Sequence, residues 1–167
     1  SVGPDSIEYH GKNFTTVTVP ISPNDTETGS TFNGHGTHVA GTIAGTGNNA
    51  LGVTGVNWKA QLMALRICDK AGCWQSAEIA ALQFAYENGA RVANESFGGG
   101  GIYPLEAEAI QAAGVWAVSD TCKLCKGLVV VAAAGNSSSN NDVTPFYPAS
   151  YHLSNMITVG ALNGQPS

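Results

Sequence analysis

The chain has 167 residues, of which 43% are hydrophobic and only 11% are charged, and its formal net charge is −5. This length allows one hydrophobic core but not two ordinary domains, and this composition excludes an intrinsically disordered chain. The few basic residues are scattered and no apolar run is long enough for a membrane span, so we expect neither a nucleic-acid surface nor contact with a membrane.

Residues 1–33 form a loop-rich N-terminal segment in which only residues 14–19 are predicted to form a strand, and residues 34–167 are predicted to form an α/β core. Strands are predicted over residues 61–67, 90–97, 128–134 and 156–161. A short helix is predicted to begin at residue 37, and two further helices are predicted over residues 76–88 and 104–118. Strands that alternate with helices indicate βαβ units and therefore a parallel sheet.

A short block around His35 is the first candidate catalytic feature. It reads Asn-Gly-His-Gly-Thr-His-Val-Ala-Gly from Asn33 to Gly41. The flanking glycines let the backbone turn sharply and leave a substrate unobstructed by a Cβ atom. His35 is expected at the junction of a loop and a helix, where an imidazole can act as a general base. The alternative is that His35 and His38 form half of a metal site, although no third ligand lies at helical spacing.

The second block is an apolar run from Leu128 to Ala134 that ends in Gly135 and Asn136. Such a run is typical of a strand buried on both faces of a parallel sheet. Asn136 is then expected at the carboxyl end of the strand, where open α/β sheets bind ligands and where an amide can donate to a developing oxyanion. An ordinary Asx turn that leaves a strand is the alternative interpretation.

These two blocks resemble two catalytic blocks of the subtilisin-like serine proteases, and the resemblance covers about residues 10–165. It implies a parallel sheet with helices on both faces, here with an incomplete core, and an endopeptidase that hydrolyses peptide bonds of a polypeptide substrate. His35 would be the general base and Asn136 the oxyanion donor. The resemblance also implies that His38 points back into the protein.

Two further stretches resemble the walls of the family's substrate pocket. Ser96, Phe97 and Gly98 would form the strand edge that pairs with an extended peptide. Ala133, Ala134 and Gly135 would form the opposite wall, beside the residue that precedes the cut.

Residues 47–56 resemble the calcium loop of the family. The Asn49 side chain and the main-chain carbonyls of Gly47, Leu51 and Val53 would bind a structural calcium ion, which prefers six or more oxygen ligands. A plain turn of glycine and asparagine residues is the alternative.

The sequence also departs from the family pattern. The Gly-Thr-Ser-Met-Ala-type block of the nucleophile does not occur in these 167 residues, and the aspartate block is either around Asp5 or precedes Ser1. We therefore expect a fragment or one processed chain of a protease, inactive by itself, with the remainder of the domain as a possible partner chain. A catalytically inactive module kept for binding or assembly is the alternative.

Four cysteines stand at positions 68, 73, 122 and 125. Cys68 follows the carboxyl end of one predicted strand, whereas Cys122 and Cys125 precede the amino end of another, so the two pairs lie at opposite edges of a parallel sheet. We expect local disulfides, Cys68 with Cys73 and Cys122 with Cys125, or free thiols, rather than a four-cysteine zinc site. The cysteines, together with glycosylation sequons at Asn13 and Asn24 in loop-like sequence, favour an extracellular or secretory location.

Overall fold

The computed structural model describes residues 11–15, 34–115 and 126–162. The chain divides into two compact units, residues 1–81 and 82–167, each of which is described by itself. Asp5, Asn24, Cys122 and Cys125 lie outside the described residues, as do residues 16–19 of the first predicted strand. Among the described residues, no helix has both the length and the hydropathy needed to cross a membrane.

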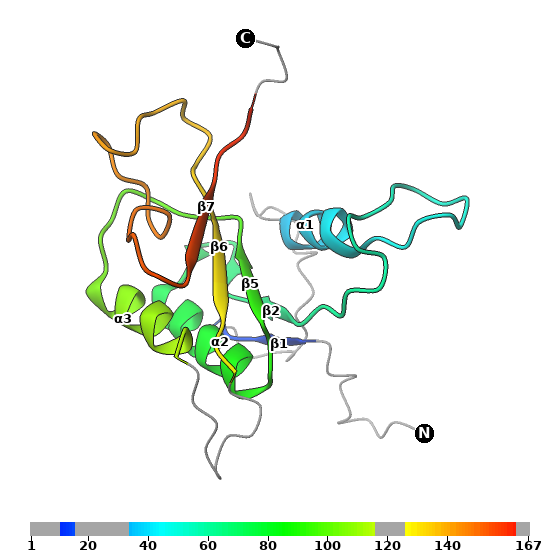
Figure 1. Ribbon diagram of the computed structural model, residues 1–167, viewed down its shortest axis with the longest axis horizontal. Helices are drawn as coiled ribbons and strands as arrows, with labels where there is room; N and C mark the ends of the chain where they lie inside the picture. Colours follow the sequence, from blue (N-terminus) through cyan, green and yellow to red (C-terminus); the bar gives the residue numbers. More distant parts are fainter. Residues whose placement is uncertain (1–10, 16–33, 116–125, 163–167) are drawn as a thin grey trace. The chain divides into compact units, whose positions relative to one another are not determined.

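The described residues of the first unit form one complete helix and two small sheets, of which Figure 1 labels α1, β1 and β2. Helix α1 covers His35–Ala44, and strand β1 (Gly11–Asn13) pairs in parallel with β2 (Ala64–Arg66). The predicted strand over residues 14–19 is thus misplaced at its start, because the parallel ladder ends at Asn13. Asn13 also lies in β1 rather than in a loop, and its side-chain Oδ1 accepts the Thr15 backbone N–H at 2.9 Å.

A disulfide-closed hairpin follows β2 in the first unit. Strand β3 (Cys68–Asp69) pairs antiparallel with β4 (Gly72–Cys73), and Cys68 is bonded to Cys73, as the sequence predicted. The buried Asp69 carboxylate accepts hydrogen bonds from the Ala71 backbone N–H at 2.8 Å and from the Trp74 indole N–H at 3.2 Å. Covalent closure and these two bonds hold the short hairpin together.

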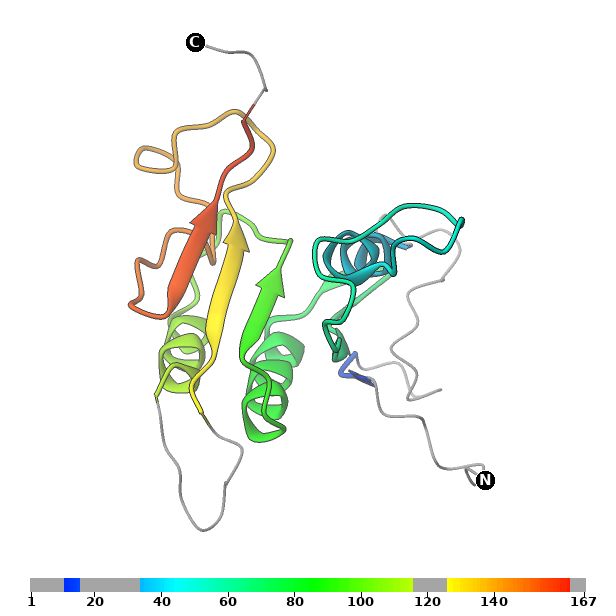
Figure 2. The same ribbon diagram turned by 45° about the vertical axis from the view of Figure 1, so that its right-hand side comes forward.

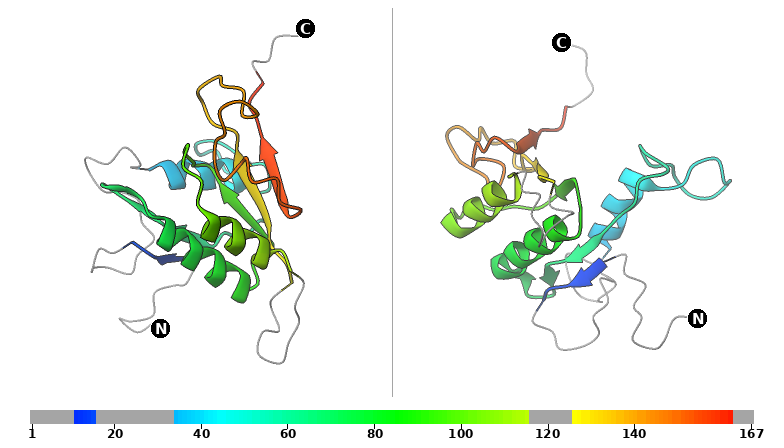
Figure 3. Two further views of the ribbon diagram at one scale, coloured as in Figure 1. Left: turned by 90° about the vertical axis from the view of Figure 1, so that its left-hand side faces the viewer. Right: turned by 60° about the horizontal axis from the view of Figure 1, so that its bottom comes forward.

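The second unit is a parallel three-stranded sheet in the order β5-β6-β7, formed by Val92–Glu95, Val129–Ala133 and Met156–Val159. Helix α3 (Pro104–Ala113) and the end of α2 (Gln75–Glu87) lie on one face of this sheet (Figures 2 and 3). The buried side chains of this layer come from both helices, from β6 and from the residue before β6, namely Leu82, Ala85, Ile110, Ala113, Leu128, Val130 and Ala132. The α/β fold with parallel sheets agrees with the prediction.

The other face of the sheet is apolar and exposed within this unit. Val92 on β5 is 59% exposed and Ile157 on β7 is 54% exposed, and Val129 between them is also exposed. Side chains alternate along each strand, so Val129 faces away from the helices while Val130 faces them. The described helices of this unit therefore cover only one face of the sheet.

Helix α3 ends at Ala113, five residues before the predicted end at Val118. Its C-cap is Gly114, whose backbone N–H bonds to the carbonyls of Ile110 and Gln111. A Cβ atom at Gly114 would lie 2.5 Å from the Asn155 side chain, so only glycine fits there. The helical periodicity of the sequence runs past this point, but the contact with Asn155 requires a glycine where the helix stops.

The Asn155 side chain joins three elements of the second unit. Its Nδ2 donates to the carbonyl of Ile110 on α3 at 2.8 Å and to the carbonyl of Leu128, next to β6, at 3.1 Å. The backbone carbonyl of Asn155 accepts the Val130 N–H at 2.9 Å, in the ladder between β6 and β7. One residue thus fixes the position of α3 against the two neighbouring strands.

We predict that Asn155→Ala lowers the free energy of unfolding by about 1–3 kcal/mol, because two part-buried carbonyls lose their donor. Denaturant unfolding monitored by circular dichroism measures the change. Asn88→Ala is the matched control, since Asn88 makes one exposed hydrogen bond to a helix carbonyl, and we expect a change within about 0.5 kcal/mol. Equal effects of the two substitutions would contradict the role of Asn155.

Candidate active-site segments

His35 is the first residue of α1 in the first unit, and its side chain is exposed. The preceding Gly34 has a φ of 74°, a left-handed conformation that favours glycine, and its carbonyl accepts the His38 N–H at 2.8 Å. The helix therefore begins two residues earlier than predicted, and His35 stands at its start with its imidazole accessible. His38 is also exposed, so the expectation that it points into the protein is wrong for this structure.

The loop that resembles a calcium site returns to the end of α1. The Gly55 N–H donates to the Gly45 carbonyl at 2.8 Å, which closes the loop at its base. Asn49 Oδ1 accepts the Leu51 N–H at 3.1 Å, so the asparagine makes an Asx turn. Asn49 and Leu51 are exposed.

The donor atoms of this loop are amide and main-chain oxygens, which suit calcium. In the part of the chain that the structure describes, no group of three or more histidine, cysteine, aspartate or glutamate residues is arranged to hold a metal ion. The zinc alternatives predicted for the histidine pair and for the cysteines therefore gain no support from the described residues.

The two predicted walls lie at the same edge of the second unit's sheet. Ser96 follows the last residue of β5, and Ala134 follows the last residue of β6, which is parallel to it. Gly99 forms an antiparallel bridge with Tyr147, with N–H to carbonyl distances of 2.8 and 2.7 Å. The loop that leaves β6 thus returns to the segment that leaves β5.

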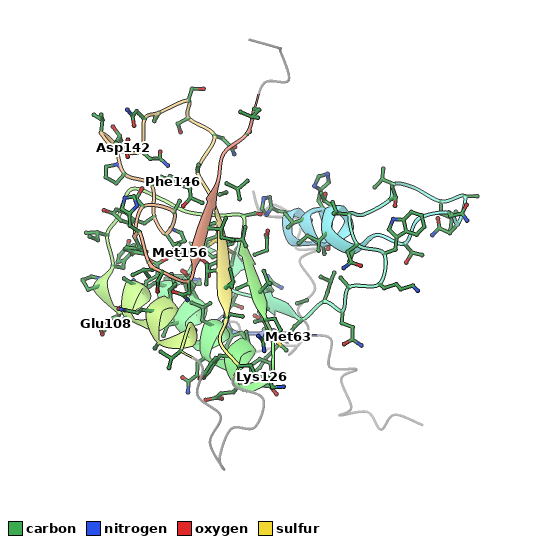
Figure 4. The ribbon with its side chains drawn as sticks, viewed as in Figure 1. Met63, Glu108, Lys126, Asp142, Phe146 and Met156 are labelled. Carbon is green, nitrogen blue, oxygen red and sulfur yellow. A yellow bond between two sulfur atoms is a disulfide. The ribbon has the colours of Figure 1, made fainter. Side chains whose placement is uncertain are left out.

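Phe146 lies in that returning loop (Figure 4) and contacts both walls. A Cβ atom at Gly98 would lie 2.5 Å from the Phe146 ring, and one at Gly135 would lie 3.3 Å from it. The glycine at the end of each wall is therefore in close contact with the same aromatic side chain.

Asn136 is exposed and follows Gly135, whose φ of 93° favours glycine. The Ala134 N–H donates to the Val159 carbonyl at 2.9 Å, and the Ala134 carbonyl accepts Asn141 Nδ2 at 3.0 Å. These bonds hold the backbone just before Asn136 at the carboxyl edge of the sheet, where the sequence predicted it. His35 belongs to the first unit and Asn136 to the second.

Comparisons with known proteins agree with the motifs. The sequence profile of the subtilase family matches residues 8–167. The chain belongs to the subtilase family. It is 42% identical over 147 residues to subtilisin amylosacchariticus of Bacillus subtilis subsp. amylosacchariticus, an alignment that covers 87% of this chain and 34% of the relative. It is 41% identical over 130 residues to subtilisin Savinase of Lederbergia lenta, covering 77% of this chain and 42% of the relative.

The fold of this subtilase is also similar to solved structures of the family. The psychrophilic subtilisin-like protease Apa1 from the Antarctic Pseudoalteromonas sp. AS-11 matches with a TM-score of 0.60 and 29% identity, covering 89% of this chain and 30% of Apa1. The S41 psychrophilic protease matches with a TM-score of 0.58 and 29% identity, covering 74% of this chain and 38% of that one. The chain spans about a third of the length of the first relatives it matches.

The second unit of this subtilase also contains, among its described residues, two buried carboxyl groups that sequence reasoning missed. Glu95 at the end of β5 and Glu106 in the first turn of α3 are each 4% exposed. Glu106 Oε2 accepts the Tyr151 hydroxyl at 2.6 Å, and that hydroxyl accepts the Tyr103 N–H at 3.0 Å. Glu95 Oε2 is buried and has no hydrogen-bond partner among the described residues.

Burial, and secondarily the charge of Glu106, raises the pKa of Glu95 from 4.5 to about 8. The carboxyl group of Glu95 is thus protonated in the folded protein at neutral pH. The alternation of side chains along residues 92–95 is the one signal in the sequence for this burial. It places Glu95 on the same face of the strand as Ala93.

This pKa predicts a dependence of stability on pH. Between pH 4.5 and 8 the unfolded chain releases a proton from Glu95 that the folded protein retains. The contribution of this group is therefore fully present below about pH 4.5 and is lost as the pH rises to about 8. Within that range the unfolding equilibrium constant should increase by up to about tenfold per pH unit through this one proton.

Glu95→Gln should remove this increase, because the amide does not titrate. Glu108→Gln is the matched control, since it makes the same substitution at an exposed position on α3. Denaturant unfolding at several pH values between 4 and 9 (roughly the window of the shift) measures the slopes. A Glu95→Gln variant with the same slope as the control would show that Glu95 is ionised in the fold.

Proposed function

We propose that this chain is part of the catalytic domain of a subtilisin-like serine endopeptidase, with His35 as the general base and Asn136 as the oxyanion donor. The observation that carries the proposal is the placement of Asn136 and of the segment from Ser96 to Gly98 at one edge of a parallel sheet. This edge is where open α/β sheets bind their ligands. Membership of the subtilase family supports the same chemistry.

The reaction would follow the scheme of serine proteases. A serine hydroxyl attacks the peptide carbonyl while the imidazole of His35 takes its proton, and His35 then gives that proton to the leaving amine. The oxygen of the tetrahedral intermediate accepts a hydrogen bond from the Asn136 side-chain amide. An aspartate would hold the imidazole in the required tautomer.

Residues 1–167 do not contain the sequence block that carries the nucleophilic serine in this family. The chain spans about a third of its first relatives, so we propose that the serine lies in a further part of the same protease or in a partner chain made from it. Asp5 and a residue that precedes Ser1 remain the two candidates for the aspartate. On this proposal the 167-residue chain is inactive by itself.

The substrate would be a polypeptide that binds in extended form beside residues 96–98. Gly98 is exposed and has no side chain, so a peptide backbone can approach it closely. The disulfide between Cys68 and Cys73 supports an extracellular or secretory location, because such bonds persist in oxidising environments.

We also propose that the loop of residues 47–53 binds a structural calcium ion. The Asn49 side-chain carbonyl and the main-chain carbonyls of Gly47, Leu51 and Val53 supply oxygen ligands only. Asn49 Oδ1 retains a second lone pair after accepting the Leu51 N–H. The remaining ligands would come from other parts of the protein, since calcium takes six to eight oxygens.

A catalytically inactive binding module is the second candidate function. Residues 1–167 contain no block of the nucleophile, and the accessible His35 and Asn136 fit a binding module as well as an enzyme. Labelling with a serine-directed fluorophosphonate separates the two candidates. An inactive module offers no activated serine even in its complete form, whereas a protease does.

We predict that a fluorophosphonate labels the complete protease on a serine outside residues 1–167 and does not label the 167-residue chain. His35→Ala should abolish both labelling and turnover, because the hydroxyl loses its base. Asn136→Ala should lower kcat by roughly 10²–10³ with little change in KM, the effect that removal of one oxyanion donor has in subtilisin. Mass spectrometry of the labelled peptide and steady-state kinetics provide the measurements.

His152→Ala is a suitable control for these substitutions, since His152 is exposed and lies in the loop before β7, outside the proposed machinery. It should retain labelling and turnover. Absence of labelling in the complete protein would support the inactive module. Unchanged kcat in Asn136→Ala would reduce Asn136 to a turn residue.

For the metal, we predict that calcium raises the thermal midpoint of unfolding and that a chelator lowers it. Asn49→Ala should abolish the response, because it removes the only side-chain ligand of the loop. Asn57→Ala is the matched control, since Asn57 makes the same kind of turn, with its Oδ1 accepting the Lys59 N–H at 3.1 Å, outside the ligand set. An equal calcium response in both variants would place the ion elsewhere.

A further inference from the structure

The side chain of Phe146 reaches from one proposed wall of the substrate pocket to the other. At the Gly98 end, the ring atoms nearest to an added Cβ would be Cε1 and Cζ of Phe146, at 2.5 and 2.9 Å. At the Gly135 end they would be Cγ, Cδ1 and Cδ2, at 3.3 to 3.4 Å. The outer part of the ring therefore contacts Gly98 and its inner part contacts Gly135.

The backbone of Phe146 is held on both sides, so the ring is not free to move away with its loop. The Phe146 N–H donates to Ser150 Oγ at 3.1 Å, and the Phe146 carbonyl accepts the Ser150 N–H at 3.0 Å. The next residue, Tyr147, forms the antiparallel bridge to Gly99 with two backbone hydrogen bonds. These hydrogen bonds fix the backbone that carries the ring, and the ring therefore lies at the ends of both walls.

Gly98 and Gly135 are subject to different physical constraints. Gly135 has a positive φ, which already favours glycine. Gly98 is not among the residues with a positive φ, so its backbone accepts any residue, and the constraint on it is space. A side chain at Gly98 would collide with the Phe146 ring and with the Tyr147 carbonyl oxygen. The sequence thus has glycine at position 98 where the ring of Phe146 needs room.

We propose that the Phe146 ring fills the pocket between the walls at residues 96–98 and 133–135, so that this protease cleaves after residues with small side chains such as glycine, alanine or serine. The inference rests on the proposed function, because it assigns the two walls to the residue that precedes the cut. A phenylalanine in a substrate would have to displace the ring, and overfilling a packed apolar site is unfavourable. An alanine side chain is a single methyl group and requires much less displacement of the ring.

The test uses the complete protease and peptide anilides that differ only in the residue before the cut, which is alanine, leucine or phenylalanine. We expect kcat/KM to be about 10- to 100-fold higher for alanine than for phenylalanine, the range that a fixed pocket achieves with apolar side chains. Phe146→Ala should reverse this preference by opening room for a ring. Phe146→Leu, which keeps an apolar side chain and protects against failure to fold, should give an intermediate ratio.

Phe84→Ala is the matched control, since it removes an aromatic ring on α2 and should leave the ratio between substrates unchanged. An unchanged ratio in an active Phe146→Ala variant would overturn the inference and leave the proposed function standing. Failure of the wild-type protease to cleave any of the peptides would overturn the proposed function instead.

Discussion

The parallel pairing of β6 with β5 and β7 is the constraint on which the candidate site depends. Parallel strands end at the same edge of a sheet, so the segments that follow β5 and β6 emerge side by side. The register places Glu95 opposite Ala132 and Ala133 opposite Val159, which puts Ser96 at the level of Ala133, one residue before Ala134. Asn155 supports this arrangement by binding the carbonyls of Ile110 and Leu128.

The same register explains why a carboxyl group is buried beside a proposed substrate wall. Side chains alternate along β5, and Glu95 falls on the face that packs against the helices, as Val130 and Ala132 do. Ser96, the next residue, follows the end of β5 and begins the proposed wall. Glu95 is the last residue of β5 and residues 96–98 follow it directly, so a buried carboxyl group lies next to the proposed substrate wall.

The buried carboxyls and the walls belong to one connected set of contacts. Glu106 accepts the Tyr151 hydroxyl, and the Tyr151 ring packs on that of Tyr147 with 4.7 Å between centroids. Tyr147 in turn bonds to Gly99 at the end of the first wall. The loop that carries Asn136 at its start thus carries at its end the residues that contact the first wall.

Much of the local structure could be predicted from the sequence. The alternation of strands and helices, the glycines around His35, the apolar strand before Asn136 and the disulfide between Cys68 and Cys73 depend on neighbouring residues, and pattern and spacing report these well. The boundaries were less accurate. Helix α3 stops at Ala113, and the glycine that follows it packs against Asn155, a residue 41 positions further along the chain.

The sequence by itself determined the family, the α/β class and the identity of the candidate catalytic residues, because these follow from short motifs with strict requirements for particular residues. Only the tertiary structure decided that Glu95 Oε2 is buried without a hydrogen-bond partner among the described residues, that His38 is exposed and that Phe146 contacts both Gly98 and Gly135. Each of these depends on contacts between segments far apart in the chain. Burial and close approach are properties of the packed fold, and no local pattern of residues encodes them.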